Sequence, residues 1–317
     1  MSPTASRRRT ATPGPAAPNV PADQRIEVRK TYKLYIGGAF PRSESGRTYE
    51  VHDSHDRFLA NAAMGSRKDA RDAVVAARGA FGKWSGATAY NRGQVLYRVA
   101  ELMEGRRAEF ATGVAQAEGL SATRADTVVS QAIDRWVWYA GWADKIAQVM
   151  GGVNPVAGPY FNISAPEPTG VVATLAPQRS SLLGLVSVLA PIVVAGNTAV
   201  VLTSERRPLP AVTLSEVLAT SDVPAGVINL VTGRTAEVAP WLAAHQDVNA
   251  IDLTGAADAD GVSWAELEEA SAGNLKRVLR PAGEGADAVE PDWSQVPDLT
   301  RIKAYLETKT VWHPKGR

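Results

Sequence analysis

Cysteine is absent from this sequence of 317 residues. Without a thiol the chain can form no disulfide, no thiolate metal site and no cysteine nucleophile. A G-x-G-x-x-G turn after a strand and a Walker phosphate loop are missing as well, so two common phosphate-binding signatures are absent. No histidine and acid pair is placed to activate a serine. From the residues alone, the sequence therefore indicates no reaction.

The sequence also has no large excess of positive or negative charge. The formal net charge is only +1, which argues against a general role in binding nucleic acid or another polyanion. Arginines 7–9 lie in a leader rich in Pro, Ala, Ser and Thr (1–30), whose composition predicts a disordered basic tail, although it could also touch an acidic surface. No apolar stretch follows these arginines, so we expect no signal peptide.

An unbroken membrane-spanning segment is missing too. The most apolar run, residues 182–202, has Pro191 in its middle and is broken again by the turn residues 195–197. We interpret it as a buried helix, a tight turn and a buried strand. We therefore expect a soluble, cytoplasmic protein with no membrane partner.

The four histidines offer one candidate metal site. His52 and His55, in VHDSHD, are close enough to share a metal ion with Asp53 or Asp56. Such a polar stretch more commonly marks the exit from a strand, and we expect no metal site.

The first half of the chain is mainly helical in pattern. Residues 31–53 predict two short strands, and Ser66 with Asp69 predicts a capped helix start. Helical periodicity then continues to Met150. The pattern breaks near two glycines, Gly86 and Gly119. The aromatic cluster in RWVWYAGWADKI has helical spacing, which favours a place in the core over a ligand site.

The second half alternates apolar strands with amphipathic helices. Five strands are predicted, at 170–177, 198–204, 226–233, 248–256 and 275–280. Four helices are predicted, at 181–195, 209–220, 235–245 and 263–272. This alternation predicts an α/β fold with a parallel sheet covered by helices on both faces. Ligands of such sheets bind outside the carboxyl ends of the strands. Four segments should therefore surround one crevice: 176–179, 202–205, 232–234 and 254–257.

The sheet pattern stops after Arg280. Residues 281–298 are acidic and rich in Pro and Gly, which predicts a linker. The stretch AYLETKTVW, residues 304–312, predicts one long strand.

The order of these segments resembles the aldehyde dehydrogenase superfamily. LYIGGAFPRSESGRTYEV is similar to the family's amino-terminal strand pair, and YAGWADKI to its long-helix signature. APIVVAGNTAVVL, VPAGVINLVTG and TGA followed by NLKRV resemble its cofactor domain, in the same order. AYLETKTVW resembles the last strand of the arm through which family members oligomerise. The resemblance covers about residues 32–280 and 299–312.

The resemblance implies a Rossmann-like parallel sheet covered by helices, an N-terminal helical region and a protruding β oligomerisation arm. It divides the chain into six parts: a disordered basic tail (1–30), arm strands (31–53), the N-terminal helical part of the cofactor domain (54–168), the NAD-binding-type domain (169–280), an acidic linker replacing the catalytic domain (281–298) and a C-terminal oligomerisation strand (299–317).

Three catalytic elements of the family are missing, so we predict no catalytic residues. The family's nucleophilic cysteine lies in the catalytic domain that the linker replaces. Its general-base glutamate should follow NLKRV, where Pro281 stands and Glu284 comes three residues too late. Arg179 aligns with its oxyanion-stabilising asparagine. The reaction needs a thiolate to form a thiohemiacetal, and a serine hydroxyl without an activating base cannot replace it.

The family's cofactor site is altered rather than absent. Glu205 could accept hydrogen bonds from ribose hydroxyls, and Gly233, Thr254 and Gly255 are the other candidate cofactor-binding residues. The lysine that shares the task of Glu205 in the family has become Leu202. Losing one charge-assisted hydrogen bond costs about 1.5–3 kcal/mol, or roughly 10- to 100-fold in affinity.

The phosphate side of the site is changed as well. Ala256 replaces a serine of the family, and the loop after it carries Asp258 and Asp260, whose carboxylates would repel a pyrophosphate. We therefore expect no NAD(P) binding, or only weak binding. Alternatively, the strand before Leu202 simply packs the sheet.

Three functions remain open. The first is a pseudoenzyme subunit that assembles with a full-length, active NAD(P)-dependent aldehyde dehydrogenase. Its contacts would be the N-terminal strands and the segment from Tyr305 to Trp312. The second is a dinucleotide-binding regulatory module. The third, an aldehyde oxidoreductase acting alone, is disfavoured by the missing cysteine.

Overall fold

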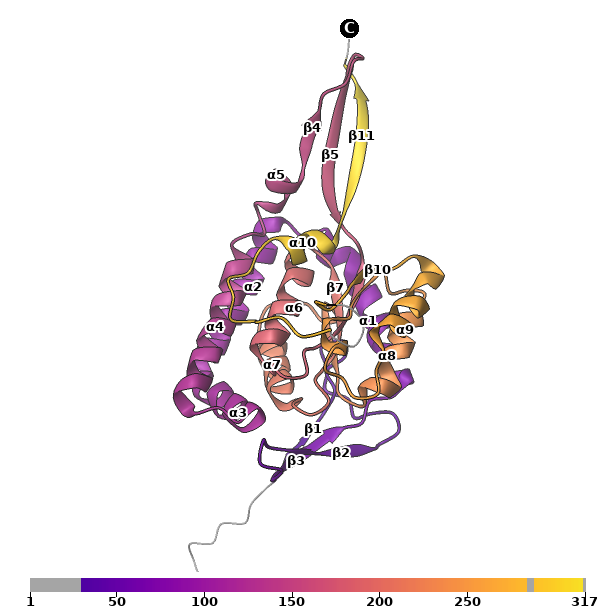
Figure 1. Ribbon diagram of the computed structural model, residues 1–317. Coiled ribbons are helices and arrows are strands. Elements are labelled where there is room, and N and C mark those ends of the chain that lie inside the picture. Colours follow the sequence, from indigo (N-terminus) through magenta and orange to yellow (C-terminus); the bar gives the residue numbers. More distant parts are fainter. Residues whose placement is uncertain (1–29, 284–287, 316–317) are drawn as a thin grey trace, which may run out of the picture. The chain divides into compact units, whose positions relative to one another are not determined.

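The five predicted strands of the second half form one parallel sheet. In the computed structural model, which describes residues 30–283 and 288–315, the strand order is β10-β9-β6-β7-β8 (Figure 1). The strands are β6 (Val171–Leu175), β7 (Thr198–Leu202), β8 (Ile228–Val231), β9 (Ala250–Asp252) and β10 (Arg277–Leu279). Every residue of β6 to β9 is buried, which explains their continuous apolar runs. The predicted α/β class is confirmed.

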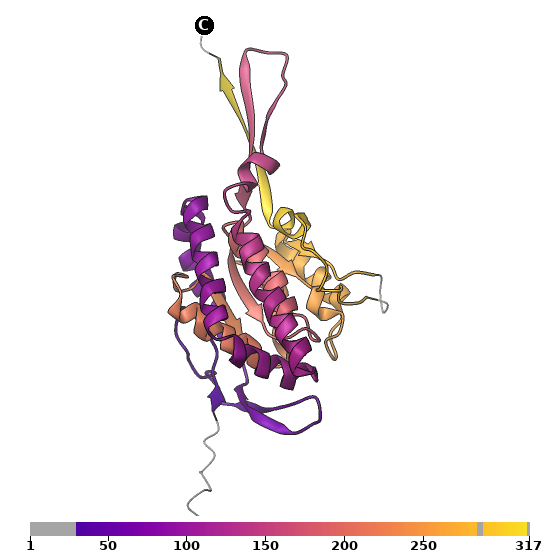
Figure 2. The ribbon, with the colours of Figure 1, turned by 90° about the vertical axis from the view of Figure 1, so that its left-hand side faces the viewer.

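Helices cover both faces of this sheet (Figures 1 and 2). One face packs against α2 (Ala89–Gly105), α4 (Ala122–Ala140), α6 (Leu183–Val194) and α7 (Leu209–Thr220). The other packs against α1 (Arg67–Ser85), α8 (Thr235–Ala244) and α9 (Trp264–Ser271). Trp136 and Tyr139 are fully buried, so the aromatic cluster belongs to the core as predicted.

The helical region begins and breaks mostly where the sequence indicated. Ser66 and Asp69 form the capping box of α1, and Gly86 and Gly119 follow the ends of α1 and of α3 (Arg107–Glu118). One break was not predicted: the chain leaves α4 at Gly141 and makes shorter i→i+3 bonds, such as Trp142 N to Tyr139 O at 3.0 Å. Helix α5 (Ile146–Met150) follows, so YAGWADKI is not one continuous helix.

The N-terminal strands do not join the C-terminal strand in an arm, so this part of the predicted domain division is wrong. β1 (Thr31–Tyr32), β2 (Thr48–His52) and β3 (Phe58–Ala63) form a separate sheet of order β1-β3-β2. The segment after β1 is attached to the central sheet, because Tyr35 and Leu230 exchange backbone hydrogen bonds of 3.0 and 2.7 Å. The alanine-rich β3 lacks the β-branched residues that would have marked it as a strand.

The protruding arm is built from other segments. β4 (Gly152–Asn154), β5 (Tyr160–Pro168) and β11 (Leu306–Pro314) form an antiparallel sheet of order β11-β5-β4 that extends away from the helices (Figure 1). β4 and β5 lie within the region predicted to be helical (54–168), so that prediction fails there. Helix α10 (Thr300–Ala304) precedes β11.

Tyr305 is not part of the arm surface. Its side chain is buried, as is that of Leu306, so the exposed residues of β11 begin at Glu307. The predicted partner contact from Tyr305 to Trp312 stays a prediction, and the exposed residues within it are Glu307 to Trp312. Between β10 and α10, the described residues 280–283 and 288–299 form no helix and only one isolated bridge, Ala282 with Val289.

Candidate functional site

The crevice at the carboxyl ends of the central strands is closed by contacts within the chain. Glu205, just after β7, accepts hydrogen bonds from Arg234 Nη1 at 2.6 Å and from the backbone N–H of Thr235 at 2.8 Å. Thr235 is the first residue of α8, so the carboxylate caps the positive end of that helix. Both oxygens predicted to accept from a ribose therefore already have donors.

Gln178 ties the loops after β6 and β7 together. Its Oε1 accepts from the backbone N–H of Glu205 at 3.0 Å, and its Nε2 donates to Ala176 O at 2.9 Å. Ser204 Oγ donates to the carbonyl of Gln178 at 3.2 Å. The crevice wall on this side is thus held in one conformation by the chain's own hydrogen bonds.

Gly233 and Gly255 are required by close backbone packing. Gly233 has φ +149°, and a Cβ there would lie 3.0 Å from Gly65 N. A Cβ on Gly255 would lie 2.2 Å from Ala176 O. The fourth candidate, Thr254, donates from its N–H and its hydroxyl to Asp252 Oδ1 at 2.9 and 2.5 Å. Packing and hydrogen bonding within the chain thus account for all three residues.

The two loop carboxylates are neutralised by arginines. Arg179 pairs with Asp258 at 2.8 Å, and Arg206 pairs with Asp260. The repulsion expected from these carboxylates is therefore offset within the chain. Arg179, aligned with the family's oxyanion asparagine, is committed to this ion pair across the crevice.

The linker also occupies the crevice, which the sequence did not indicate. Glu290 Oε1 accepts from the backbone N–H of Gln178 and from that of Arg179, the latter at 3.2 Å. Burial raises the pKa of the Glu290 carboxyl, and the two N–H donors oppose this only in part. A carboxylate from the linker thus covers the N–H groups exposed after β6.

A buried polar cluster joins α10 to β9. Asp252 is completely buried and pairs with Arg301 at 2.5 Å, while the Tyr305 hydroxyl donates to the same carboxylate at 2.8 Å. Burial opposes the charged form of Arg301, but Asp252 outweighs it and the pKa of Arg301 is raised. An aspartate inside the apolar run NAIDLTG was the signal for this cluster, because buried carboxylates are almost always paired.

The histidine-rich stretch after β2 is a capped turn. Asp53 accepts from the backbone N–H of Arg57 at 2.9 Å, from Arg57 Nε at 2.7 Å and from the N–H of His55 at 2.8 Å. These hydrogen bonds, led by the Arg57 N–H, lower the pKa of Asp53 to about 2. Among the described residues there is no group of three or more His, Cys, Asp or Glu side chains that could hold a metal ion.

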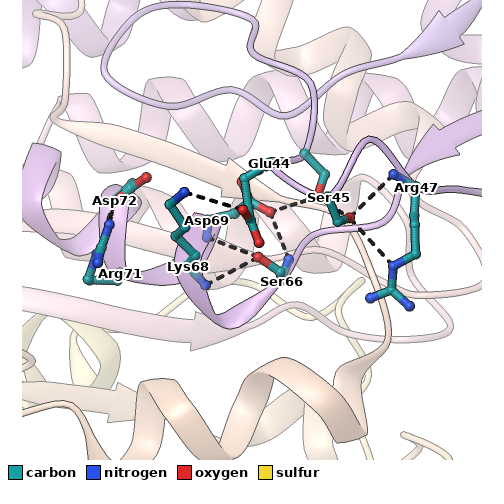
Figure 3. Close-up of polar contacts among 9 residues, drawn as sticks. Glu44, Ser45, Arg47, Ser66, Lys68, Asp69, Arg71 and Asp72 are labelled. Atoms are coloured by element: carbon teal, nitrogen blue, oxygen red, sulfur yellow. Dashed lines mark hydrogen bonds and ion pairs between the residues drawn. The ribbon is translucent and has the colours of Figure 1, made fainter.

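A separate cavity of about 570 Å³ lies between the start of α1 and the end of α8. Figure 3 shows its polar surroundings, in which Lys68 pairs with Glu44 at 3.3 Å and Asp69 accepts from the backbone N–H groups of Ser66 and Glu44. These contacts fasten the loop after β1 to the first turn of α1. They are structural, and the cavity wall contains none of the candidate cofactor residues.

The sheet, its covering helices and the crevice at its strand ends define an α/β protein of the dinucleotide-binding type. The chain belongs to the aldehyde dehydrogenase family, whose sequence profile matches residues 40–293. A putative aldehyde dehydrogenase of Bacillus subtilis, DhaS, is 33% identical over 276 residues, which is 84% of this chain and 53% of that protein. The cytosolic 10-formyltetrahydrofolate dehydrogenase of Pongo abelii is 32% identical over 264 residues, 81% of this chain and 29% of that protein.

Solved structures agree. HpcC of Thermus thermophilus superposes with a TM-score of 0.74 at 30% identity, covering 80% of this chain and 48% of that one. The NAD+ complex of an aldehyde dehydrogenase from Bacillus cereus gives 0.73 at 27% identity, covering 80% and 51%. The chain thus spans about half the length of DhaS and of these two solved chains, and 29% of the formyltetrahydrofolate dehydrogenase. The described residues contain no helix long and apolar enough to cross a membrane.

Proposed function

We propose that this chain is a catalytically inactive subunit of the aldehyde dehydrogenase family that assembles with a full-length, active NAD(P)-dependent aldehyde dehydrogenase. One observation supports this most directly: the crevice is filled by the chain's own side chains, while the arm is completely formed. The polar groups that would serve a cofactor have internal partners. The segment that would serve assembly is exposed.

The missing chemistry supports the same proposal. Oxidation of an aldehyde through a thioester requires a thiolate, and the sequence has no cysteine. Arg179 stands where the family has its oxyanion asparagine and is paired with Asp258. Pro281 stands at the aligned position of the general base.

The arm supports the choice of partner. Val153, Ile163 and Val311 lie in one cross-strand row, and with Phe161 they form an exposed apolar surface that we call the arm face. The outer edge of β11 is unpaired among the described residues and can accept a further strand. In the family, the arm adds to a sheet of a neighbouring subunit's catalytic domain. The described residues between β10 and α10 contain no such sheet, so the acceptor must come from a complete dehydrogenase.

Co-purification tests the proposal. The chain is expressed with and without a full-length aldehyde dehydrogenase of the same cell, and the product is analysed by size exclusion and aldehyde oxidation. We expect a stable hetero-oligomer and no turnover by the chain alone. A deletion of residues 306–317 should abolish assembly while keeping Arg301 and Tyr305, which the fold needs. A well-behaved monomer with no dehydrogenase bound, or turnover that persists through purification, would contradict the proposal.

The second candidate function is a dinucleotide-binding regulatory module. The retained parallel sheet and the likeness to an NAD+ complex favour it. Calorimetric titration of the purified chain with NAD and NADP separates the two proposals. Saturable micromolar binding would support the regulatory module, whereas its absence together with hetero-oligomer formation would support the assembly role.

A further inference from the structure

A smaller pocket, of about 240 Å³, lies beside the N-terminal sheet, at the end of the molecule opposite the arm (Figures 1 and 2). Its wall comes from β1 and the residue after it, from the loop that leads into β2 and from the end of β3. We call it the basic pocket. It shares no residue with the crevice or with the arm, so neither of those regions accounts for it.

The charged residues that line the basic pocket are Lys33, Arg42 and Arg47, and no described residue of its wall is acidic. The side chains of Lys33 and Arg42 have no hydrogen bond, ion pair or aromatic contact within the described parts of the chain. Arg47 donates only from Nε, to Ser45 Oγ at 3.5 Å, and Figure 3 shows its guanidinium apart from the Glu44 carboxylate. Three like charges at one small pocket repel one another, so the pocket favours an anion.

The carboxylates near the basic pocket do not cancel these charges. Asp69 lies behind the wall, where it accepts from the Ser43 hydroxyl at 2.8 Å. Glu44 is balanced by Lys68, at 3.3 Å. Glu50 lies farther along β2, outside the wall, with an exposed side chain. Even if the charges of Asp69 and Glu50 are added to those of the three cations, the region keeps an excess of positive charge.

A tight turn brings two of the cations to the same pocket. The backbone N–H of Gly46 donates to Ser43 O at 2.9 Å, and Gly46 has φ +67°, a left-handed conformation that glycine adopts readily. Arg42 and Arg47 flank this turn on either side, and both line the pocket. The hydroxyl of Thr48, which has no partner among the described residues, adds a neutral donor to the wall. The loop thus presents both charge and hydrogen-bond donors to one small volume.

We propose that the basic pocket binds a phosphate group, either as the free ion or as a small monoester. A phosphate group carries about two negative charges at neutral pH and offers several acceptor oxygens. Guanidinium forks match these oxygens, and a lysine adds a point charge. Sites for drug-sized ligands usually have volumes of about 300–1,000 Å³, so this smaller pocket suits the phosphate group itself. The proposal does not depend on the assembly role, and either can fail alone.

Two phosphates and two carboxylates test the proposal. Inorganic phosphate and phenyl phosphate are titrated against the full chain at neutral pH and low ionic strength by calorimetry, with acetate and benzoate as singly charged probes. We expect saturable binding of the phosphates at millimolar concentration or below, and at least about tenfold weaker binding of the carboxylates. Tighter binding of phenyl phosphate than of inorganic phosphate would identify a monoester as the ligand, and equal binding the free ion. Equal binding of phosphates and carboxylates, or no saturable binding of either phosphate, would overturn the proposal.

Single variants distinguish a ligand-binding role of the cations from a structural one. Arg42→Gln and Arg47→Gln should each lower phosphate affinity about tenfold or more. Each also relieves repulsion within the pocket, so the thermal midpoint of the free protein should not fall. Arg124→Gln, at an exposed position on α4 outside the pocket, makes the same change of charge and should alter neither value. Unchanged phosphate affinity in both pocket variants, an equal loss in Arg124→Gln, or a lower thermal midpoint without ligand would reject the role assigned to these arginines.

Discussion

The crevice and the arm differ in whether their side chains have partners within the chain. In the crevice, Glu205 and Glu290 accept hydrogen bonds from residues of the same chain. On the arm, Ile163 and Val311 are 45% and 48% exposed although they lie opposite each other in the sheet. The reverse side of the arm has the hydrogen-bonded pair Ser164 and Thr310, joined at 2.9 Å, beside the exposed aromatic pair Tyr160 and Trp312.

Under the proposed assembly role, this difference favours the arm over the crevice as the contact surface. A buried polar group is costly unless it is hydrogen-bonded, and in the crevice that requirement is met without a ligand. Covering exposed apolar surface with a partner contributes about 25 cal/mol per Å² to binding, and the arm face is such a surface. The central sheet is intact, while the exposed apolar side chains that a partner could cover lie on the arm.

The largest effect is expected where α10 joins β9 of the central sheet. Asp252→Ala leaves Arg301 as an uncompensated charge, which should lower the free energy of unfolding by about 3–5 kcal/mol. Urea denaturation followed by circular dichroism measures this loss. The double variant Asp252→Leu with Arg301→Met replaces the ion pair by apolar groups and should recover most of the stability. A loss below about 1 kcal/mol in the single variant would show that α10 is not locked to β9.

The next effect tests the arm face. Ile163→Lys with Val311→Glu replaces an apolar cross-strand pair by opposite charges, which preserves the strand pairing but removes apolar contact area. Affinity for the partner dehydrogenase should fall about 100-fold or more, since burying each side chain contributes about 1.5–3 kcal/mol. Biolayer interferometry measures this change.

A matched pair on the other side of the same strands provides the control. Ser164→Lys with Thr310→Glu makes the same charge change at adjacent paired positions. We expect partner affinity to remain close to that of the wild type. If the two double variants lose affinity equally, the arm face is not the contact surface and the comparison with the crevice fails.

Several of these features could be predicted from the sequence. The strands β6 to β9 were recognisable because buried parallel strands are continuous apolar runs. The arm strand β5 was hidden by its two prolines, Pro166 and Pro168, which argue against a strand in local patterns. Glu205 was identified as a crevice residue from its position at the end of β7.

The partners of these residues could not be predicted, because they depend on loop geometry. Arg234 lies 29 residues from Glu205, and Glu290 lies 111 residues from Arg179. Neither pairing leaves a periodic signal.

A smaller effect on NAD affinity is expected when Glu205 loses its hydrogen bond from the Arg234 side chain. Arg234→Ala removes the side-chain donor to Glu205 Oε1 at 2.6 Å, so one oxygen becomes available to a ribose hydroxyl. Affinity for NAD should rise about tenfold from a very weak value, as measured by calorimetry. Arg206→Ala leaves Glu205 paired and removes the partner of Asp260, so it should not raise NAD affinity. Weaker binding in Arg234→Ala would instead favour the regulatory module, with Arg234 as a phosphate ligand.

The smallest effect concerns Glu290 and pH. Because burial raises the pKa of this carboxyl in the folded state, the folded protein holds the proton more tightly than the unfolded chain, whose value is about 4.3. The contribution of Glu290 to stability is therefore greatest below about pH 4.3 and is lost as pH rises through the folded-state pKa. Glu290→Gln keeps an oxygen acceptor for the N–H groups of Gln178 and Arg179 but cannot ionise. The stability of this variant relative to the wild type should thus increase from pH 4 to pH 7, as measured by urea denaturation across that range, whereas the exposed Glu269→Gln on α9 should show no such trend. A relative stability that decreases with pH would mean that the charged carboxylate is the form the crevice prefers.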